Sequence, residues 1–334
     1  MSLFPNPPIF LFSATLTSSS IMAISSSNWV FLWISMELNL LSFTPIMMVG
    51  KNNQEIEGSI KYFLAQATGS AILLFSSSML WMLQTWSPNS FALFLTFSIL
   101  LKMGGAPCHF WYPSVMSSIS WIPCLILSTW QKVAPISILA FLLPTNSNII
   151  TTLAGLNALT GGIMGMNQNS MRSIMAFSSI GQMGWMMSLM AIYKPVASVL
   201  YFIIYMSLIA PLFLIFNTLN TKTIKSLNKS YSKSTLIQAS ISLLLLSIAG
   251  LPPLTGFFPK LMTIFLLTEH SKLLTLMLIS GSLMNLFFYL NMMINASMSA
   301  SEIKSPKSQI TSTTMYILIL SCTMSTLMLP LTMF

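Results

Sequence analysis

Long apolar stretches, separated by short segments of polar residues, glycine and proline, run along almost the whole chain. Each stretch is continuous over about 20 residues, the length that an α-helix needs to cross a bilayer core, and lacks the alternation of a half-buried strand. Since a backbone in lipid must satisfy its own hydrogen bonds, such stretches indicate helices. The pattern predicts an all-α polytopic membrane protein with about eleven transmembrane helices, near residues 6–24, 28–49, 58–83, 88–118, 120–143, 148–167, 171–192, 195–217, 236–269, 272–295 and 311–333.

Two of the predicted spans, 88–118 and 236–269, are too long for one crossing at about 1.5 Å per residue. Both contain glycine and proline near the middle, and these residues leave backbone groups without partners inside the helix. We therefore expect two broken helices. The breaks are predicted at Gly104, Gly105 and Pro107 in the first and at Gly250, Pro252 and Pro253 in the second.

The two breaks occupy matching places in two successive sets of five spans. The first set covers residues 6–143, the second covers 148–295, and a C-terminal helix over 311–333 follows. Because five is an odd number, the second set would be inverted relative to the first, as in many transporters. The whole chain, residues 1–334, is predicted to be one membrane domain built from two inverted repeats.

Composition supports a membrane protein and narrows the chemistry. Apolar residues make up 54% and charged residues 6% of the chain, and the mean hydropathy is +0.80, which excludes a soluble domain. The three cysteines lack the spacing of a metal cluster, a zinc site or a disulfide framework. We therefore expect no metal and no redox centre on this chain.

The net charge of +9 comes from lysines in short loops, without the stacking aromatics of a nucleic-acid-binding face. The predicted loops can be assigned to the two sides of the membrane. Eight loop cations lie on the side of the N-terminus and two lie on the opposite side. The positive-inside rule therefore places the N-terminus on the cytoplasm-like or matrix-like face. The polar stretch 217–234 is better explained as an orientation loop than as a lipid or partner contact. The eight are Lys51, Arg172, Lys222, Lys225, Lys229, Lys233, Lys304 and Lys307, and the two are Lys194 and Lys272.

Four ionisable residues remain near the middle of predicted spans: Glu37, Lys102, Lys132 and Lys260. A charge at such a position costs about 2.5 to 3.5 kcal/mol on insertion scales, so these residues usually face the protein interior and mark a relay or pathway. Burial disfavours the charged form of a lysine and a nearby carboxylate favours it, so Glu37 and Lys102 could couple the arrival of charge to proton release. Lys132 would be the next station of a proton path.

Structural alternatives exist for each of these residues. Glu37 could be a buried acid satisfied by Asn39 or a serine, Lys102 could only bind the carbonyls of its broken helix, and Lys132 could extend to an interface. Two further residues are possible relays. His109 could carry protons or make a structural hydrogen bond, and Lys61 could relay protons but fits an interfacial anchor better.

Four segments of the chain are distinctive when taken together. They are Lys102-Met-Gly-Gly-Ala-Pro-Cys-His-Phe-Trp, Thr129-Trp-Gln-Lys-Val-Ala-Pro, Met171-Arg-Ser-Ile-Met-Ala-Phe-Ser-Ser-Ile-Gly-Gln-Met-Gly-Trp and Gly250-Leu-Pro-Pro-Leu-Thr-Gly-Phe-Phe-Pro-Lys. These segments resemble the antiporter-like chain 2 family of mitochondrial NADH:ubiquinone oxidoreductase, respiratory complex I. The resemblance runs nearly end to end, and the 28 methionines and single arginine resemble a protein encoded in an animal mitochondrial genome.

The resemblance implies a subunit of the complex I membrane arm, in the mitochondrial inner membrane, that moves protons while other subunits oxidise NADH and reduce ubiquinone. It implies that FMN, iron–sulfur clusters and ubiquinone belong to other subunits, and that the partners are membrane-arm subunits, accessory subunits and lipids. Glu37 and Lys102 would be the coupled pair, Lys132 the central relay, and Lys260 the station toward a neighbouring subunit or the exit. Bacterial members have fourteen helices, and this chain lacks the first three.

Two other function classes fit parts of the pattern. A free-standing cation/proton antiporter would share the helix pattern, but Glu37 is the only acid near mid-membrane, whereas antiporters usually hold more carboxylates there to bind a cation. A structural scaffold would use the buried charges only to fix helix packing. The sequence favours the complex I subunit over both.

Overall fold

The computed structural model describes residues 7–50, 52–82, 88–141, 147–223 and 235–300. Within these ranges the regular secondary structure is α-helix, apart from an isolated bridge between Ser170 and Thr223. The all-helical fold class predicted from the sequence is therefore confirmed. The chain divides into two compact units, Met1–Ile149 and Ile150–Phe334.

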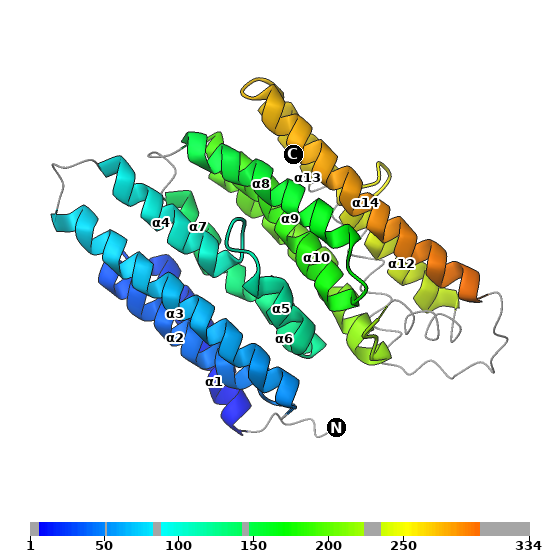
Figure 1. Cartoon of the computed structure of the whole chain (residues 1–334), viewed down its shortest axis with the longest axis horizontal. Coiled ribbons are helices and arrows are strands. Elements are labelled where there is room, and N and C mark those ends of the chain that lie inside the picture. Colours follow the sequence, from blue (N-terminus) through cyan, green and yellow to red (C-terminus); the bar gives the residue numbers. More distant parts are fainter. Residues whose placement is uncertain (1–6, 51, 83–87, 142–146, 224–234, 301–334) are drawn as a thin grey trace. The chain divides into compact units, whose positions relative to one another are not determined.

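Unit 1 is a helical bundle in which α1, α2 and α3 lie side by side (Figure 1). Helix α3 also packs on α4 and α5, while α7 packs on α1, α4 and α6. The helices of unit 1, within the described residues, are α1 (Pro7–Ser25), α2 (Trp29–Met47), α3 (Asn53–Met82), α4 (Pro88–Met103), α5 (Trp111–Ser118), α6 (Trp121–Ser128) and α7 (Trp130–Phe141).

Unit 2 is built around α9, in which every residue except Arg172 is buried. Helices α10, α13 and α14 pack on α9, and α12 packs on α10, α13 and α14 (Figure 1). A helix covered on all sides can carry polar residues without exposing them to lipid. The helices of unit 2 in the described ranges are α8 (Ser147–Met166), α9 (Met171–Ala191), α10 (Pro195–Leu219), α12 (Thr235–Ala249), α13 (Phe257–Thr268) and α14 (Lys272–Ala300).

Close approach between helices of unit 2 is made possible by small residues. A Cβ atom added to Gly161 of α8 would lie 2.6 Å from the backbone nitrogen of Gly181 in α9, and one added to Gly165 would lie 2.8 Å from the ring of Phe288 in α14. These distances are too short for a real side chain. The Gly161-x-x-x-Gly165 motif, which is typical of tightly packed membrane helices, therefore lies at helix contacts.

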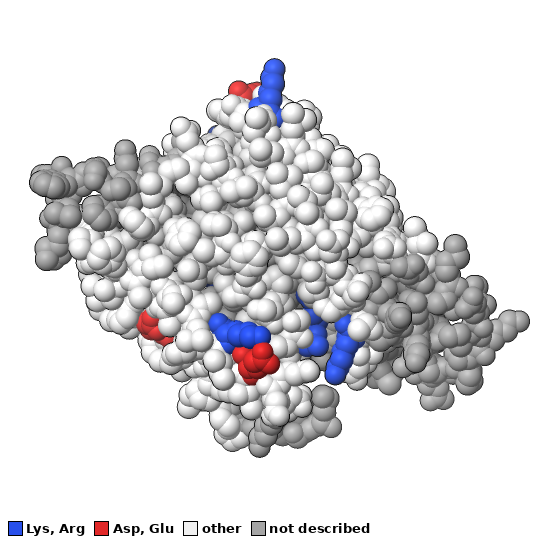
Figure 2. Space-filling model, in the orientation of Figure 1, with Lys and Arg blue, Asp and Glu red and all other residues white. Residues whose placement is uncertain are grey.

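The surface of the helices is apolar, as expected for a protein whose solvent is lipid. Large hydrophobic side chains on several helices are more than half exposed, and few charged side chains reach the face shown in Figure 2. By length and composition, six helical segments in the described part of the chain could cross a membrane, so this is a multi-pass membrane protein. They are Pro7–Ser25, Trp29–Met47, Trp121–Ala140, Asn148–Met166, Pro195–Leu219 and Lys272–Ile294.

Contacts at helix ends agree with alternating helix directions inside each unit. In unit 1, a Cβ atom at Gly58, near the start of α3, would overlap the hydroxyl of Ser118 at the end of α5. In unit 2, the backbone N–H of Met171 donates to the carbonyl of Lys222 over 3.2 Å, which joins the start of α9 to the segment after α10. Both pairs of ends were assigned to the side of the N-terminus from the sequence.

The two broken helices are confirmed, since α4 and α5 replace the span 88–118, and α12 and α13 replace the span 236–269. Two other details of the sequence prediction are wrong. Span 120–143 is also interrupted, at Thr129 between α6 and α7, and Pro135 of α7 cannot donate to the carbonyl of Gln131 and crowds it. Helix α3 begins at Asn53 rather than at residue 58, so Glu55 lies in its first turn, where the helix dipole favours an acid.

Several predicted features lie outside the described residues. They are the span 311–333, Cys322, Lys51, Lys225, Lys229, Lys233, Lys304 and Lys307.

Candidate functional site

The break between α4 and α5 leaves carbonyl groups without helical partners, and other groups bind them. The N–H of Gly105 donates to the carbonyl of Leu100 over 2.9 Å. The indole N–H of Trp111 donates to Leu101 over 2.9 Å, and the amide of Gln66, from α3, donates to Lys102 over 3.0 Å. Each bond satisfies a buried polar group, which would otherwise destabilise the fold. The break is thus a fixed feature of unit 1.

Glycine is required at the centre of this break for two reasons. Gly104 has a φ of +72°, a conformation that other residues adopt only with strain. A Cβ atom at Gly104 would also lie 2.7 Å from the Cβ of Tyr112. Tyr112 therefore packs directly on the backbone of the break.

Lys102 ends α4 at this break and is buried, with only 7% of its surface exposed. Its aliphatic chain packs on α3, where a Cβ atom at Gly69 would lie 3.1 Å from the Cγ of Lys102. Glu37, half-buried on α2, is close enough for its charge to act on Lys102, although the two make no direct ion pair. The structure thus places Glu37 within electrostatic range of Lys102, and the coupled role of the two stays a prediction.

Lys132 lies on α7 and is 2% exposed. Its ammonium nitrogen has no hydrogen-bond partner and lies 4.8 Å from the centre of the Tyr112 ring, within the range of a cation–π contact. Tyr112 therefore contacts the Gly104 break on one side and Lys132 on the other. An ammonium held only by an aromatic ring can gain or lose its proton without breaking an ion pair.

The second break, between α12 and α13, binds a lysine directly. The ammonium of Lys260 donates to the carbonyls of Ala249 over 2.6 Å and Ile248 over 3.3 Å, at the end of α12. Gly250 has a φ of +88°, and a Cβ atom there would lie 2.8 Å from the Lys260 ammonium nitrogen. The glycine is required both for the turn and for the approach of the lysine.

The remaining predicted residues have diverse surroundings. His109 is 3% exposed, lies 3.2 Å from the carbonyl of Pro107 through its Nδ1, and stacks on Phe110 at 4.3 Å. These contacts hold the ring inside the first break. Pro252 and Pro253 are exposed at the second break.

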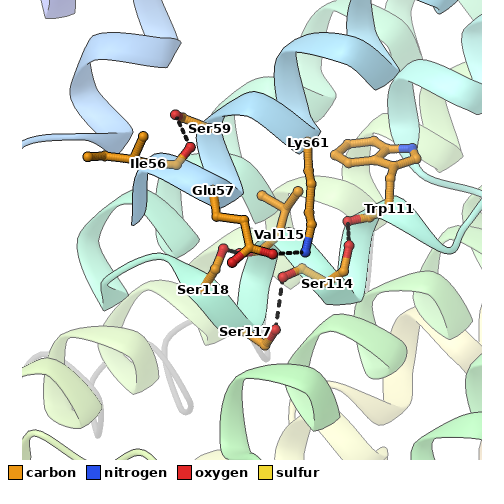
Figure 3. Close-up of polar contacts among 9 residues, drawn as sticks. All are labelled: Ile56, Glu57, Ser59, Lys61, Trp111, Ser114, Val115, Ser117 and Ser118. Atoms are coloured by element: carbon orange, nitrogen blue, oxygen red, sulfur yellow. Dashed lines mark hydrogen bonds and ion pairs between the residues drawn. The ribbon is translucent and has the colours of Figure 1, made fainter. Parts of the chain in front are cut away.

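Lys61 lies at the surface near the start of α3, where it pairs with Glu57 (Figure 3). The two side chains are 2.6 Å apart and 46% and 64% exposed. The hydrogen bond and then the charge of Lys61 hold the pKa of the Glu57 carboxyl below its usual value, so the pair is intact at neutral pH. Figure 3 shows this pair beside Ser114, Ser117 and Ser118 of α5. Lys61 is therefore placed as an interfacial anchor would be.

Three residues at the breaks were missed in the sequence: Gln66, Tyr112 and Gln182. Gln66 binds the carbonyl of Lys102, and Gln182 binds the carbonyl of Ile248 over 3.2 Å. A glutamine in an apolar span was a visible signal, because a buried amide needs partners. Nothing in the sequence indicated that Tyr112 would be the aromatic partner of Lys132.

A family model described as "NADH:quinone oxidoreductase/Mrp antiporter, TM" matches residues 26–285. The NADH-ubiquinone oxidoreductase chain 2 of Lumbricus terrestris is 52% identical over 326 residues, which cover 97% of each chain. The chain belongs to the NADH-ubiquinone oxidoreductase chain 2 family. The chain 2 of Xenopus laevis is 40% identical over 306 residues, or 89% of this chain and 88% of the relative.

Two solved structures contain chains with the same fold as this chain. A chain of respiratory complex I from Thermus thermophilus with bound aureothin aligns with a TM-score of 0.87, at 18% identity, over 98% of this chain and 78% of that chain. A chain of the Mrp complex from Dietzia sp. DQ12-45-1b aligns with a TM-score of 0.76, at 18% identity, over 86% of this chain and 59% of that one. The chain 2 fold is therefore common to complex I and to an Mrp complex.

Proposed function

We propose that this chain is a core membrane-arm subunit of respiratory complex I that translocates protons, while other subunits oxidise NADH and reduce ubiquinone. Membership of the chain 2 family supports the assignment to the complex. The observation that carries the proton role is the burial of Lys132 without a hydrogen-bond partner, one aromatic ring away from the Lys102 break. An ionisable residue in such a place is expensive and is expected to serve a pathway.

Contacts inside unit 1 support the proposed order of Glu37, Lys102 and Lys132. A change of charge near Glu37 would act on Lys102, and the Lys102 break and Lys132 share Tyr112, so protonation can be coupled from one lysine to the next. Lys260, held by the second break, would serve as the station toward a neighbouring subunit or the exit. His109 is a possible relay inside the first break.

The chain is proposed to hold no redox centre, with FMN, the iron–sulfur clusters and ubiquinone bound by other subunits. Cys108 and Cys124 are free thiols, and the described residues contain no group of three or more His, Cys, Asp or Glu side chains arranged for a metal. Membrane-arm subunits, accessory subunits and lipids are the proposed partners.

We propose about eleven crossings of the mitochondrial inner membrane in two inverted repeats, with the N-terminus on the matrix side. The apolar helix surfaces support the membrane location, and the excess of cations in one set of loops supports the orientation. Protease treatment of mitochondria without their outer membrane, and of inverted inner-membrane vesicles, would test it. A tag at the N-terminus should be cut only in the inverted vesicles.

The alternative function is a free-standing antiporter. Its support is that the description of the family model includes an Mrp antiporter and that one of the solved structures is an Mrp complex. Migration of the chain on a native gel, stained for NADH dehydrogenase activity, separates the two. We expect co-migration with an active band near the megadalton range. A small, inactive particle would favour the antiporter.

Glu37→Gln and Lys102→Met are each expected to lower the coupled turnover of the assembled complex by roughly fivefold, because each removes one charge of the pair. Coupled NADH oxidation in sealed vesicles measures the effect, with Lys225→Met as a control expected to be nearly silent. Equal effects of all three substitutions would contradict the proposed pair. Normal pumping by both pair variants in an assembled complex would favour the scaffold alternative.

Lys61→Met should change pumping by less than about twofold, since exposed ion pairs contribute little. The reason is its position at the surface, paired only with Glu57 four residues earlier. Dye-monitored acidification of proteoliposomes measures the rate. A loss as large as that of Lys102→Met would show that Lys61 is a relay after all.

A further inference from the structure

The proposed function does not use the polar side chains of α9, although this helix lies at the centre of unit 2. Gln182, near its middle, is 3% exposed, and Tyr201 of α10 is 3% exposed. The Tyr201 hydroxyl donates to the Oε1 of Gln182, and the Nε2 of Gln182 donates to the carbonyl of Ile248 over 3.2 Å. Both ends of the amide are therefore engaged, and Tyr201 fixes its orientation.

The carbonyl of Ile248 has a second donor, the ammonium of Lys260, at 3.3 Å. A carbonyl oxygen has two lone pairs and can accept both bonds. The lysine is closer to the carbonyl of Ala249, at 2.6 Å, so its bond to Ile248 is the longer of the two. The amide of Gln182 and the ammonium of Lys260 thus share one acceptor at the end of α12.

A small hollow of about 10 Å³ lies beside this shared carbonyl. That volume is close to the minimum that holds one water molecule, and a water also needs polar partners. Gln182, Tyr201 and Tyr205 offer polar groups at its wall. The lining residues are Gln182, Tyr201, Ile204, Tyr205, Leu208, Ile248, Gly256 and Pro259.

We propose that Gln182, oriented by Tyr201, is a positioning residue for Lys260, and that the hollow holds one water as a second partner for the amide of Gln182. A charged ammonium binds a carbonyl more strongly than a neutral amine does. The amide of Gln182 has two N–H groups, so it can donate to the water and to the Ile248 carbonyl together. When Lys260 carries its proton, the ammonium and the amide share the carbonyl, and when Lys260 releases its proton, the amide still satisfies it. Gln182 would therefore hold the end of α12 in one geometry for both protonation states of Lys260.

This inference rests on the proposed proton role of Lys260, and the experiment separates the two. The assembled complex is reconstituted in proteoliposomes, and the rate of NADH-driven proton pumping is measured for Gln182→Met, Tyr201→Phe, Lys260→Met and the double variant Gln182→Met with Lys260→Met. Methionine matches glutamine in length but cannot donate a hydrogen bond.

We expect Gln182→Met to lower the rate of NADH-driven proton pumping by about fivefold, the size that the loss of one hydrogen bond predicts. The double variant should be no worse than Lys260→Met alone, because Gln182 acts through the lysine. Gln182→His should recover part of the loss, since a neutral imidazole offers one donor and one acceptor. A purely structural glutamine would instead lower pumping further in the Lys260→Met background.

Each outcome decides one of the two ideas. If Lys260→Met pumps normally, the proton role of Lys260 fails, and the inference fails with it. If Lys260→Met is impaired but Gln182→Met pumps normally, only the inference is overturned. Should Gln182→Met fail to assemble, Tyr201→Phe decides, because it removes a single hydroxyl. A normal pumping rate in Tyr201→Phe would then overturn the inference.

Discussion

Lys132→Met is expected to lower the rate of NADH-driven proton pumping by at least about tenfold, equal to about 1.4 kcal/mol of barrier. The complex should nevertheless assemble at the normal level. Lys132 is 2% exposed and its ammonium has no hydrogen-bond partner, so its removal takes away a buried charge that only the Tyr112 ring stabilises. Replacement of such a charge by an apolar side chain is often neutral or stabilising.

Native gels would measure assembly, and dye quenching in proteoliposomes would measure pumping. Lys272→Met is the matched control, because Lys272 is exposed at the start of α14 and the chemical change is the same. Normal pumping by Lys132→Met in an assembled complex would remove Lys132 from the pathway. A loss of assembly would show that the lysine has a packing role instead.

Gly256→Ala is expected to reduce the amount of assembled complex by at least about fivefold, from an overpacking cost of about 1 to 3 kcal/mol. Gly256 precedes α13, and a Cβ atom there would overlap the carbonyl oxygen of Ser247 in α12. Both groups belong to the backbone of the second break, so neither can rotate away. The φ of Gly256 is −68°, which alanine adopts freely, so the effect would come from space alone.

The control for this prediction is Gly155→Ala. A Cβ atom at Gly155 in α8 would lie 2.7 Å from the sulfur of Met277, the end of a flexible side chain that can move. Immunoblots of native gels compare the two variants. Equal amounts of complex from both would mean that the second break can shift its backbone, contrary to the account given above.

The elements that the sequence predicted best are those with a local cause. Gly104 and Gly250 adopt positive φ angles at the two breaks, and a glycine followed by proline in a long apolar span indicates such a break without any knowledge of neighbours. The interruption at Thr129 was missed because it occupies one residue between α6 and α7 and no glycine marks it. Pro135, six residues later, was the local signal, since proline lacks the backbone N–H that a helix uses.

The charged residues of the candidate site could be predicted from the sequence, but the residues that surround them could not. Buried lysines are rare enough in apolar spans to be found one by one. Their partners come from other helices: Gln66 from α3 at the first break, and Gln182 from α9 at the second. Tyr112 is 20 residues from Lys132 in sequence, and only the packing of the helices decides which ring an ammonium meets. Such pairings require the three-dimensional structure.

The complete burial of α9 has a consequence for how the protein is made. Helix α9 is not among the six segments that are long and apolar enough to cross a membrane. If it entered the bilayer alone, its serines, Gln182 and Arg172 would face lipid. It must therefore leave the insertion machinery together with partners that cover it. Helix α8 touches it at Gly161, and α10 packs along it. Biogenesis of unit 2 would then proceed through a three-helix intermediate rather than one helix at a time.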